Sequence, residues 1–171
     1  VEGIAGIGTT KEVSNPNTLD SKNTVIRTAA MDCYILPCEY MGFDTTSIAS
    51  SDTFAALQTG VVEGLAGSTP AGAYLNYRDI IDYYYVYQMS PEVTQIMISE
   101  KTLAKLSPED QKTIVDICRQ ECANSVNYAK EEDEKYLKLM EDNGIKIVRF
   151  SDEEIEMFAE AVRTDVWPQL A

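Results

Sequence analysis

The sequence contains no histidine among its 171 residues. Without an imidazole, this chain cannot by itself build a Ser-His-Asp or Cys-His catalytic arrangement, nor a zinc or iron site that uses histidine ligands. The absence therefore removes the commonest designs of hydrolytic and metal-dependent active sites. Catalytic and metal sites that depend on an imidazole are therefore not expected in this chain.

Basic residues are also scarce. The chain has 14 lysines and arginines against 28 aspartates and glutamates, which gives a formal net charge of −14. Binding to a phosphate backbone requires clustered basic side chains, and the sequence has no such cluster. We therefore expect no nucleic-acid partner and no anionic membrane surface as a partner. If the protein recognises an anion, the attraction must come from a local positive group.

Long apolar runs are absent as well. A membrane-spanning helix needs about 20 consecutive apolar residues, and no run in this sequence approaches that length. No basic segment followed by an apolar one opens the chain, so a leader peptide is not evident. Because the first residue is Val1, we interpret the sequence as a piece of a longer precursor.

Four cysteines leave the redox compartment undecided. Cys118 and Cys122 lie one helical turn apart on the same face, a poor geometry for a disulfide, and are expected to be small core residues. Cys33 and Cys38 could close a small ring if the helix between them is broken. A metal site made of all four thiols would need two hairpin-like knuckles, and we do not expect one.

The composition, 44% hydrophobic and 25% charged, is ordinary for a globular protein and sufficient for one core. Helix and strand signals then alternate along the first half of the chain. This alternation is typical of an α/β fold with a parallel sheet. The expected elements are strands at 24–28 and 45–48, helices at 29–41 and 51–59, a strand from Val61 that ends at 63–64, and a glycine- and hydroxyl-rich loop at 67–70.

The second half predicts fewer and longer elements. A helix at 71–79 is followed by strands at 80–89 and 92–98, and alternation places Tyr83, Tyr85 and Tyr87 on one face, as in a buried strand. Ser107 is a good helix N-cap with Pro108 at the first helical position, and the helix continues to about residue 143. Its apolar stripe consists of Ile114, Cys118, Cys122, Val126 and Ala129, continued by Leu137 and Met140. A strand at 145–150 and a helix capped at Ser151 end the chain.

The segment ALQTGVVEG, residues 56–64, resembles the "aLq-G-vvDG" signature of the solute-binding proteins of TRAP (tripartite ATP-independent periplasmic) transporters. Upstream, residues 16–27 are similar to the family's "p-x-dLkG-x-kiR" segment. Downstream, residues 106–111 resemble its "Lp-e-d-q" helix start, and residues 143–148 its "GvkV" strand. These motifs occur in the family's order, so the resemblance covers roughly residues 10 to 171.

The resemblance implies a periplasmic-binding-protein-like (type II) α/β lobe with a long bracing C-terminal helix. It also implies that residues 1–171 form a single partial unit, the C-terminal portion of a two-lobed protein whose N-terminal lobe is missing. Within this unit, we expect the α/β lobe and the strands that cross between lobes at about 15–100. The long helix is expected at 107–143, and the terminal strand and helix at 145–171.

The implied function is an extracytoplasmic receptor, at the periplasmic or extracellular face of the membrane. It would capture a small organic acid and deliver it to the integral membrane permease subunits of a TRAP transporter. Such a receptor is not an enzyme, and we expect it to need no cofactor and no metal. Arg27 matches the family's carboxylate-binding arginine, and a guanidinium can pair with a carboxylate through two hydrogen bonds. Where relatives have a ligand-binding asparagine, this chain has Gly67, and where a ring lines their pocket it has Ser50. Ser68 and Thr69 could replace the missing amide.

A second hypothesis belongs to a different class. Separated from an N-terminal lobe, this segment would expose sheet edges and one face of the long helix, and such surfaces tend to pair. The alternative function is therefore a non-catalytic interaction module whose activity is homodimerisation.

Overall fold

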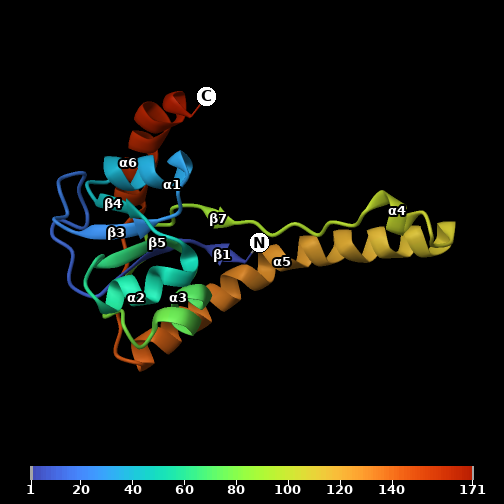
Figure 1. Ribbon diagram of the computed structural model, residues 1–171, viewed down its shortest axis with the longest axis horizontal. Helices are drawn as coiled ribbons and strands as arrows, with labels where there is room; N and C mark the ends of the chain where they lie inside the picture. Colours follow the sequence, from blue (N-terminus) through green and yellow to red (C-terminus); the bar gives the residue numbers. More distant parts are fainter. Residues whose placement is uncertain (1, 171) are drawn as a thin grey trace.

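The computed structural model describes residues 2–170 and has three layers, with helices on both faces of a mixed sheet (Figure 1). The sheet has six strands in the order β4-β3-β5-β2-β6-β8, and β1 and β7 form a separate antiparallel pair. The strands are β1 Gly3–Ile4, β2 Gly6–Thr9, β3 Val25–Thr28, β4 Asp44–Ser47, β5 Gly64–Ser68, β6 Tyr83–Tyr85, β7 Pro91–Glu92 and β8 Lys146–Val148. The helices are α1 Asp32–Tyr40, η1 Ser50–Asp52, α2 Thr53–Gln58, α3 Pro70–Tyr77, α4 Glu100–Leu103, α5 Pro108–Asp142, α6 Asp152–Ala161, η2 Val162–Val166 and η3 Trp167–Gln169.

The sheet is parallel except at β2. Strand β3 pairs in parallel with both β4 and β5, and β6 pairs in parallel with β8. Strand β2 runs antiparallel to β5 on one side and to β6 on the other. The sequence pattern predicts the parallel strands but not this antiparallel strand in the middle of the sheet. The α/β class and the long helix, α5, are confirmed.

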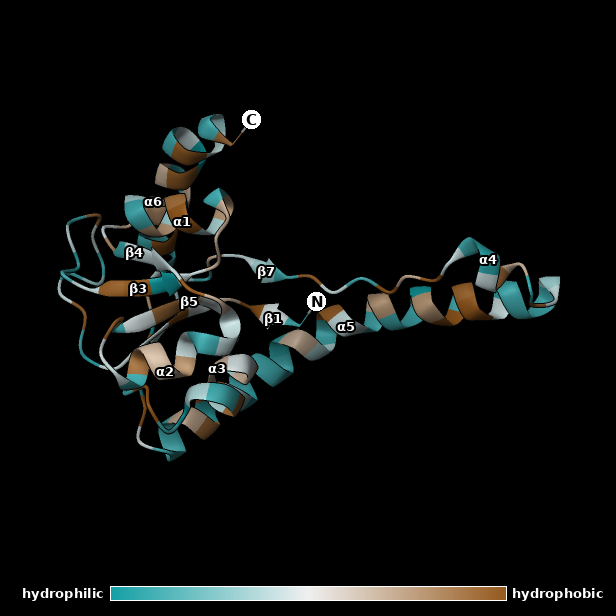
Figure 2. Ribbon diagram, viewed as in Figure 1, coloured by the Kyte–Doolittle hydropathy of each residue, from teal (hydrophilic) through white to brown (hydrophobic). Residues whose placement is uncertain are grey.

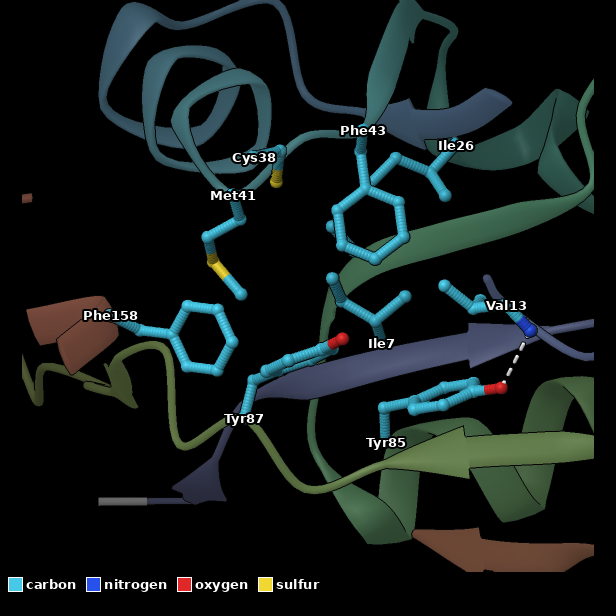
Figure 3. Close-up of a cluster of buried hydrophobic side chains, with 10 residues drawn as sticks. Ile7, Val13, Ile26, Cys38, Met41, Phe43, Tyr85, Tyr87 and Phe158 are labelled. Carbon is cyan, nitrogen blue, oxygen red and sulfur yellow. Dashed lines mark hydrogen bonds between the residues drawn. The ribbon is translucent and has the colours of Figure 1, made fainter. Parts of the chain in front are cut away.

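Two apolar clusters fill the spaces between the layers. On one face of the sheet, Cys38 of α1, Met41 directly after α1 and Phe158 of α6 pack around Ile7, Ile26 and Tyr87 (Figure 3). On the other face, α2, α3 and α5 pack over the sheet. The buried residues of this second cluster are Ala56, Leu57, Val62, Leu65, Ala73, Ile81, Tyr84, Leu137, Met140 and Ile145.

The tyrosine-rich strand is a core strand, as alternation predicts. Tyr85 and Tyr87 are buried in the first cluster, and Tyr84 is buried in the second. The hydroxyl of Tyr85 accepts a hydrogen bond from the backbone N–H of Val13 at 2.8 Å (Figure 3). The strand is much shorter than predicted, however: β6 spans residues 83–85, whereas the sequence pattern predicts 80–89.

The predicted strand at 92–98 is wrong. Within the part of the chain that the structure describes, only Pro91–Glu92 of this region forms a strand, and residues 93–98 have no regular structure. Their side chains are largely exposed, including Met97 at 83% and Val93 at 66%. Together with α4 and the N-terminal half of α5, they extend away from the body of the protein (Figure 1). We call residues 93–128 the projecting arm.

Two cysteines that the sequence pattern predicts in the core, Cys118 and Cys122, lie in the projecting arm instead. Cys118 is half-buried and Cys122 is exposed, and the structure describes all four cysteines as free thiols. Val126, from the same predicted stripe, is 49% exposed. The buried residues of α5 are Ala129, Leu137 and Met140, which lie in the half of the helix that packs on the body. Apolar residues recur along one side of the whole helix, but the body of the protein covers only the C-terminal half of α5.

The strand expected to start at Val61 begins later. The N–H groups of Val61 and Val62 both donate to the carbonyl oxygen of Ala56, at 3.0 and 3.3 Å, and thereby close the end of α2. These donors are therefore not available to a sheet ladder. The strand β5 starts at Gly64, so Gly67 and Ser68 are its last residues and not part of a loop as the sequence pattern suggests.

One buried cation makes the stability of the fold depend on pH. Lys22 is fully buried, and its ammonium group donates to the carbonyl oxygens of Thr18 at 2.5 Å and Asp20 at 2.9 Å. Burial lowers the pKa of Lys22 to about 8, against the opposing effect of the nearby Asp20 carboxylate. Because the unfolded chain then binds more protons than the folded chain between that pKa and the ordinary lysine value, stability must rise with pH across this interval.

We therefore expect the free energy of unfolding to increase by about 2 kcal/mol between about pH 7.5 and about pH 9.5. Urea unfolding monitored by circular dichroism at these two pH values measures the increase. In Lys22→Met the buried titrating group is gone, so the same change of pH should leave the stability nearly constant. An unchanged slope in the variant would assign the pH dependence to other groups. Buried tyrosines with raised pKa values reverse the trend at higher pH, so measurements stop below about pH 10.

Candidate functional site

The candidate site lies where three parallel strands end side by side. Strand β3 is flanked by β4 and β5, with Arg27 in register with Thr46 of β4 and Leu65 of β5. In open α/β sheets, ligands bind at the carboxyl ends of parallel strands, because helix starts and loops converge there. Arg27 is the penultimate residue of β3, so the sheet carries it to this edge.

One hydrogen bond orients the side chain of Arg27, and no acidic side chain in the described part of the chain neutralises its charge. Its Nε donates to the carbonyl oxygen of Ile48, just after β4, at 2.8 Å, and the side chain is half-buried. This single bond orients the guanidinium and leaves its two terminal nitrogens for another acceptor. Among the described residues, no carboxylate forms an ion pair with Arg27.

The other arginines of the body are compensated by acidic side chains. Arg149 forms two hydrogen bonds with Glu134, at 3.0 and 2.9 Å. Arg163 pairs with Glu156 and Glu160, and Arg78 lies 3.9 Å from Asp79. In the described chain, Arg27 is thus the half-buried arginine whose charge has no acidic partner. That is the arrangement expected of a residue that receives an external anion.

Ser50 belongs to the segment that follows β4 and contacts Arg27 through Ile48. It is the first residue of η1 and exposed, two positions after Ile48, whose carbonyl oxygen binds the guanidinium. The structure therefore brings the Ser50 segment and Arg27 to the same strand end. No aromatic ring occupies this position, so the edge is open and polar there.

Ser68 and Thr69 have structural roles of their own. The Thr69 hydroxyl accepts a hydrogen bond from Gly72 N at 3.1 Å and caps α3, and its side chain is buried. The Ser68 hydroxyl donates to the Thr69 carbonyl oxygen at 3.4 Å, and the Ser68 carbonyl oxygen accepts from the Tyr84 hydroxyl at 2.8 Å. Both residues lie at the carboxyl end of β5, next to the start of a helix.

Gly67 faces a different environment. It has a positive φ of 78°, and a Cβ atom at this position would lie 3.4 Å from the ring of Tyr34 on α1. It lines an apolar cavity on the α1 side of the sheet, together with residues of α6 and η2. Arg27 and Gly67 belong to the neighbouring strands β3 and β5, and a Cβ atom at Gly67 would point toward α1.

The structure adds one residue that the sequence reasoning missed. Thr28 follows Arg27, is fully buried, and its hydroxyl has no hydrogen-bond partner among the described residues. A buried polar atom without a partner is costly, so it calls for a specific explanation such as a bound water or ligand. A threonine in a strand is ordinary, and nothing in the sequence signals this deficit.

No group of three or more potential metal ligands occurs in residues 2–170, and none of the helices there combines the length and apolar character needed to cross a membrane.

Comparison with solved structures identifies the fold. The chain is similar to a TRAP periplasmic solute-binding protein from Escherichia fergusonii in an apo, open form, with a TM-score of 0.82 and 22% identity over 99% of this chain. A protein from Actinobacillus succinogenes with bound L-galactonate gives a TM-score of 0.78 at 18% identity over 99% of this chain. One from Ochrobacterium anthropi with bound L-fuconate gives 0.76 at 23% identity over 95%. The chain spans only 54–55% of the length of these proteins.

The sequence itself matches a family model. No curated protein sequence matches the chain. The model for the bacterial extracellular solute-binding protein family 7, however, matches residues 2–170, which is almost the whole sequence. The family model and the solved structures point in the same direction, towards the TRAP receptors whose motifs residues 16–27 and 56–64 resemble. The chain therefore belongs to the bacterial extracellular solute-binding protein family 7.

Proposed function

We propose that this chain is the C-terminal part of a two-lobed receptor that binds a small organic acid through Arg27. The observation that carries the proposal is the uncompensated, half-buried guanidinium at the carboxyl ends of β3, β4 and β5. In a protein with a net charge of −14, an anion needs such a local cation. The L-galactonate and L-fuconate bound by similar proteins are sugar acids, each with one carboxylate, so this ligand class supports the proposal.

The mechanism follows from the geometry of the strand end. The carboxylate would accept two hydrogen bonds from the terminal nitrogens of Arg27, while Nε remains bound to Ile48. Ser50, Ser68, Thr69 and the backbone at Gly67 would surround the polar remainder of the ligand. Closure of a second lobe over this edge would exclude water and strengthen the ion pair.

The proposed partners and location follow from the family. The closed receptor would dock on the integral membrane permease subunits of a TRAP transporter, at the periplasmic or extracellular face of the membrane. Binding, closure and release require neither catalysis nor a cofactor.

Calorimetric titration with a panel of sugar acids tests the role of Arg27. We expect Arg27→Ala to weaken binding about 100-fold, because the variant loses a charge-assisted pair worth about 3 kcal/mol. The titration should use this chain and any longer natural chain that contains it. The matched control is Arg119→Ala, which removes the same charge from an exposed residue of the projecting arm and should bind as the wild type does. Equal affinities for wild type and Arg27→Ala would refute the proposed ion pair.

A specific observation supports the second candidate function, homodimerisation. Apolar residues recur along the exposed half of α5 and along the chain that extends with it (Figure 2). Several are more than half exposed: Val93, Ile96, Met97, Ile117 and Tyr128. Exposed apolar surface of this kind marks an interaction site. Light scattering during the same experiments separates the two functions, since a stable dimer that binds none of the acids would favour the module over the receptor.

A further inference from the structure

One carboxylate of the acidic run at residues 131–134 of α5 faces the interior of the protein. Glu132 and Glu134 form ion pairs with basic residues at the helix surface. Asp133 points inward instead, and its Oδ2 accepts a hydrogen bond from the backbone N–H of Ile4 at 2.9 Å. Its Oδ1 is shielded from solvent and has no hydrogen-bond partner among the described residues. The acidic run is therefore more than a solvated helix face.

Asp133 contacts a thin part of the fold. Strands β1 and β7 pair only with each other and do not belong to the six-stranded sheet. We call this pair the β1–β7 ribbon, and Figure 1 shows that β7 leads directly into the projecting arm. Each strand has two residues, and a ribbon of two strands is at best marginally stable by itself in water. The direction of the ribbon must therefore depend on what it packs against.

Asp133 supplies a hydrogen bond that ties this ribbon to α5. The N–H groups of Glu2 and Ala5 donate across the ribbon to backbone carbonyl oxygens, both at 2.8 Å. The N–H of Ile4, which lies between them, donates to Asp133 on the helix. Gly3 allows the close approach, because a Cβ atom at this position would overlap the Oδ1 of Asp133. The helix thus provides the acceptor, and the ribbon provides a donor and a residue without a side chain.

The position of Asp133 is costly for a charge. Burial raises the pKa of the Asp133 carboxyl, the hydrogen bond from Ile4 opposes this rise, and the neighbouring Glu134 adds to it. No basic side chain of the described residues forms an ion pair with Asp133. Burial of an unpaired charge costs free energy, so stability alone does not explain an aspartate here. Residues that break a local rule in this way are expected at functional positions.

The ribbon also adjoins the candidate site. Strand β2 follows β1, and its first residue, Gly6, is paired with Ser68 at the carboxyl end of β5. At its other end, the ribbon continues from β7 into the projecting arm. A change in the direction of the ribbon would therefore act directly beside the strand ends that carry the candidate ligand-binding residues.

We propose that Asp133 is a positioning residue of the receptor, which fixes the β1–β7 ribbon on α5 and thereby sets the direction in which the chain crosses to a second lobe. The inference rests on the proposed function, in which a second lobe closes over the Arg27 edge. Segments that are held in one conformation before binding lower the entropic cost of closure. Loss of the Asp133 hydrogen bond should therefore weaken ligand binding, although Asp133 is not proposed to touch the ligand.

Amide hydrogen exchange measured by NMR tests the contact itself and needs no ligand. In Asp133→Ala, we expect the Ile4 amide to exchange at least about tenfold faster, because its acceptor is gone. Asp133→Asn keeps an oxygen in the same place and should stay within about threefold of the wild type. Amides of β2 and β5 should be unchanged in both variants. Equal exchange of the Ile4 amide in wild type and Asp133→Ala, or faster exchange throughout the sheet, would overturn the positioning role.

Titration with the same panel of sugar acids and the same chains as for Arg27 tests the link to function. An acid that binds the wild type should bind Asp133→Ala about fivefold more weakly and Asp133→Asn nearly as tightly. Glu131→Gln is the matched control, because it removes one charge from an exposed residue of the same acidic run and should bind as the wild type does.

The two ways in which this inference can fail are distinguishable. If the wild type binds an acid and Asp133→Ala binds it equally well, Asp133 does not position the closing segments, whatever its effect on the Ile4 amide. If the wild type binds none of the acids, the proposed function is refuted, and the role of Asp133 in closure is refuted with it.

Discussion

Replacement of Tyr87 by alanine is expected to lower the free energy of unfolding by about 4 kcal/mol. Tyr87 is only 3% exposed and forms the centre of an aromatic group. Its ring stacks on Phe150 at a centroid distance of 4.4 Å and meets Phe43 and Phe158 edge-on, at 6.1 and 5.2 Å. The alanine variant would lose this burial and leave a void between α6 and the sheet, which the surrounding rings cannot close.

Two further variants serve as controls. One removes only the hydroxyl of Tyr87, and the other removes an exposed tyrosine ring elsewhere in the chain. The Tyr87 hydroxyl donates to the carbonyl oxygen of Pro16 at 2.7 Å, so Tyr87→Phe should cost only about 1–2 kcal/mol. Tyr128→Ala removes a ring that is 58% exposed and should change the stability by less than about 0.5 kcal/mol. Urea unfolding gives the three values. A loss in Tyr87→Ala no larger than that in Tyr87→Phe would show that the ring packing does not stabilise the fold.

The second large effect is expected at Gly42, where a substitution to alanine should cost about 3–4 kcal/mol. Gly42 ends α1 with a φ of 88°, a conformation that costs a residue with a Cβ atom about 1–2 kcal/mol. In addition, a Cβ atom here would lie 2.2 Å from the backbone oxygen of Asp20, which cannot be avoided by rotating a side chain. Relief of such an overlap requires backbone movement, which costs about another 2 kcal/mol. That movement would also disturb the hydrogen bond from Lys22 N to the Gly42 carbonyl oxygen, at 2.7 Å.

Gly60 is a matched control within the same chain. It also follows a helix, its φ is 74°, and a Cβ atom added to it would meet no heavy atom of the surrounding structure within 4 Å. Gly60→Ala should therefore show the conformational cost alone, about 1 kcal/mol. The difference between the two variants, measured by thermal or urea unfolding, isolates the contact with Asp20. Equal losses at Gly42 and Gly60 would mean that the 19–22 segment adjusts without cost.

Signals carried by a few neighbouring residues are predicted well from the sequence. Ser107 caps α5, accepting a hydrogen bond from Asp110 N at 3.1 Å, with Pro108 at the first helical position. Ser151 and Glu154 form the predicted cap of the terminal helix as a capping box. Such caps depend on local hydrogen bonds, so their residue types are sufficient to identify them.

Features that depend on distant contacts are predicted poorly. The apolar stripe of α5 correctly indicates a helix, but it does not reveal that Cys122 and Val126 would lie beyond the body. Likewise, residues 92–98 have the β-branched composition of a strand, yet in the described chain only Pro91 and Glu92 find a partner, in β1. Composition shows what a segment can form, whereas the partner decides what it does form.

The candidate site also combines a residue that the sequence identifies with features that only the structure shows. Arg27 is identified through a resemblance of motifs, and the structure adds its bond to Ile48 and the absence of an acidic partner in the described residues. The role of Arg27 as a ligand-binding residue stays a prediction. The apolar cavity beside Gly67 could not be predicted, because Tyr34, Tyr87 and Trp167, which line it, come from segments far apart in the sequence. Only the folded chain shows that they share a space.

The projecting arm makes α5 a lever. The helix is anchored by Ala129, Leu137 and Met140, whereas about 20 residues on its N-terminal side extend beyond the body, a length of about 30 Å. A tilt of about 10° at the anchored half would move the far end by about 5 Å, roughly the rise of one helical turn. Small adjustments beneath Leu137 and Met140 would thus be magnified at the tip. A helix held only along its C-terminal half would therefore convert a shift of a few ångströms in the core into a larger displacement of its free end.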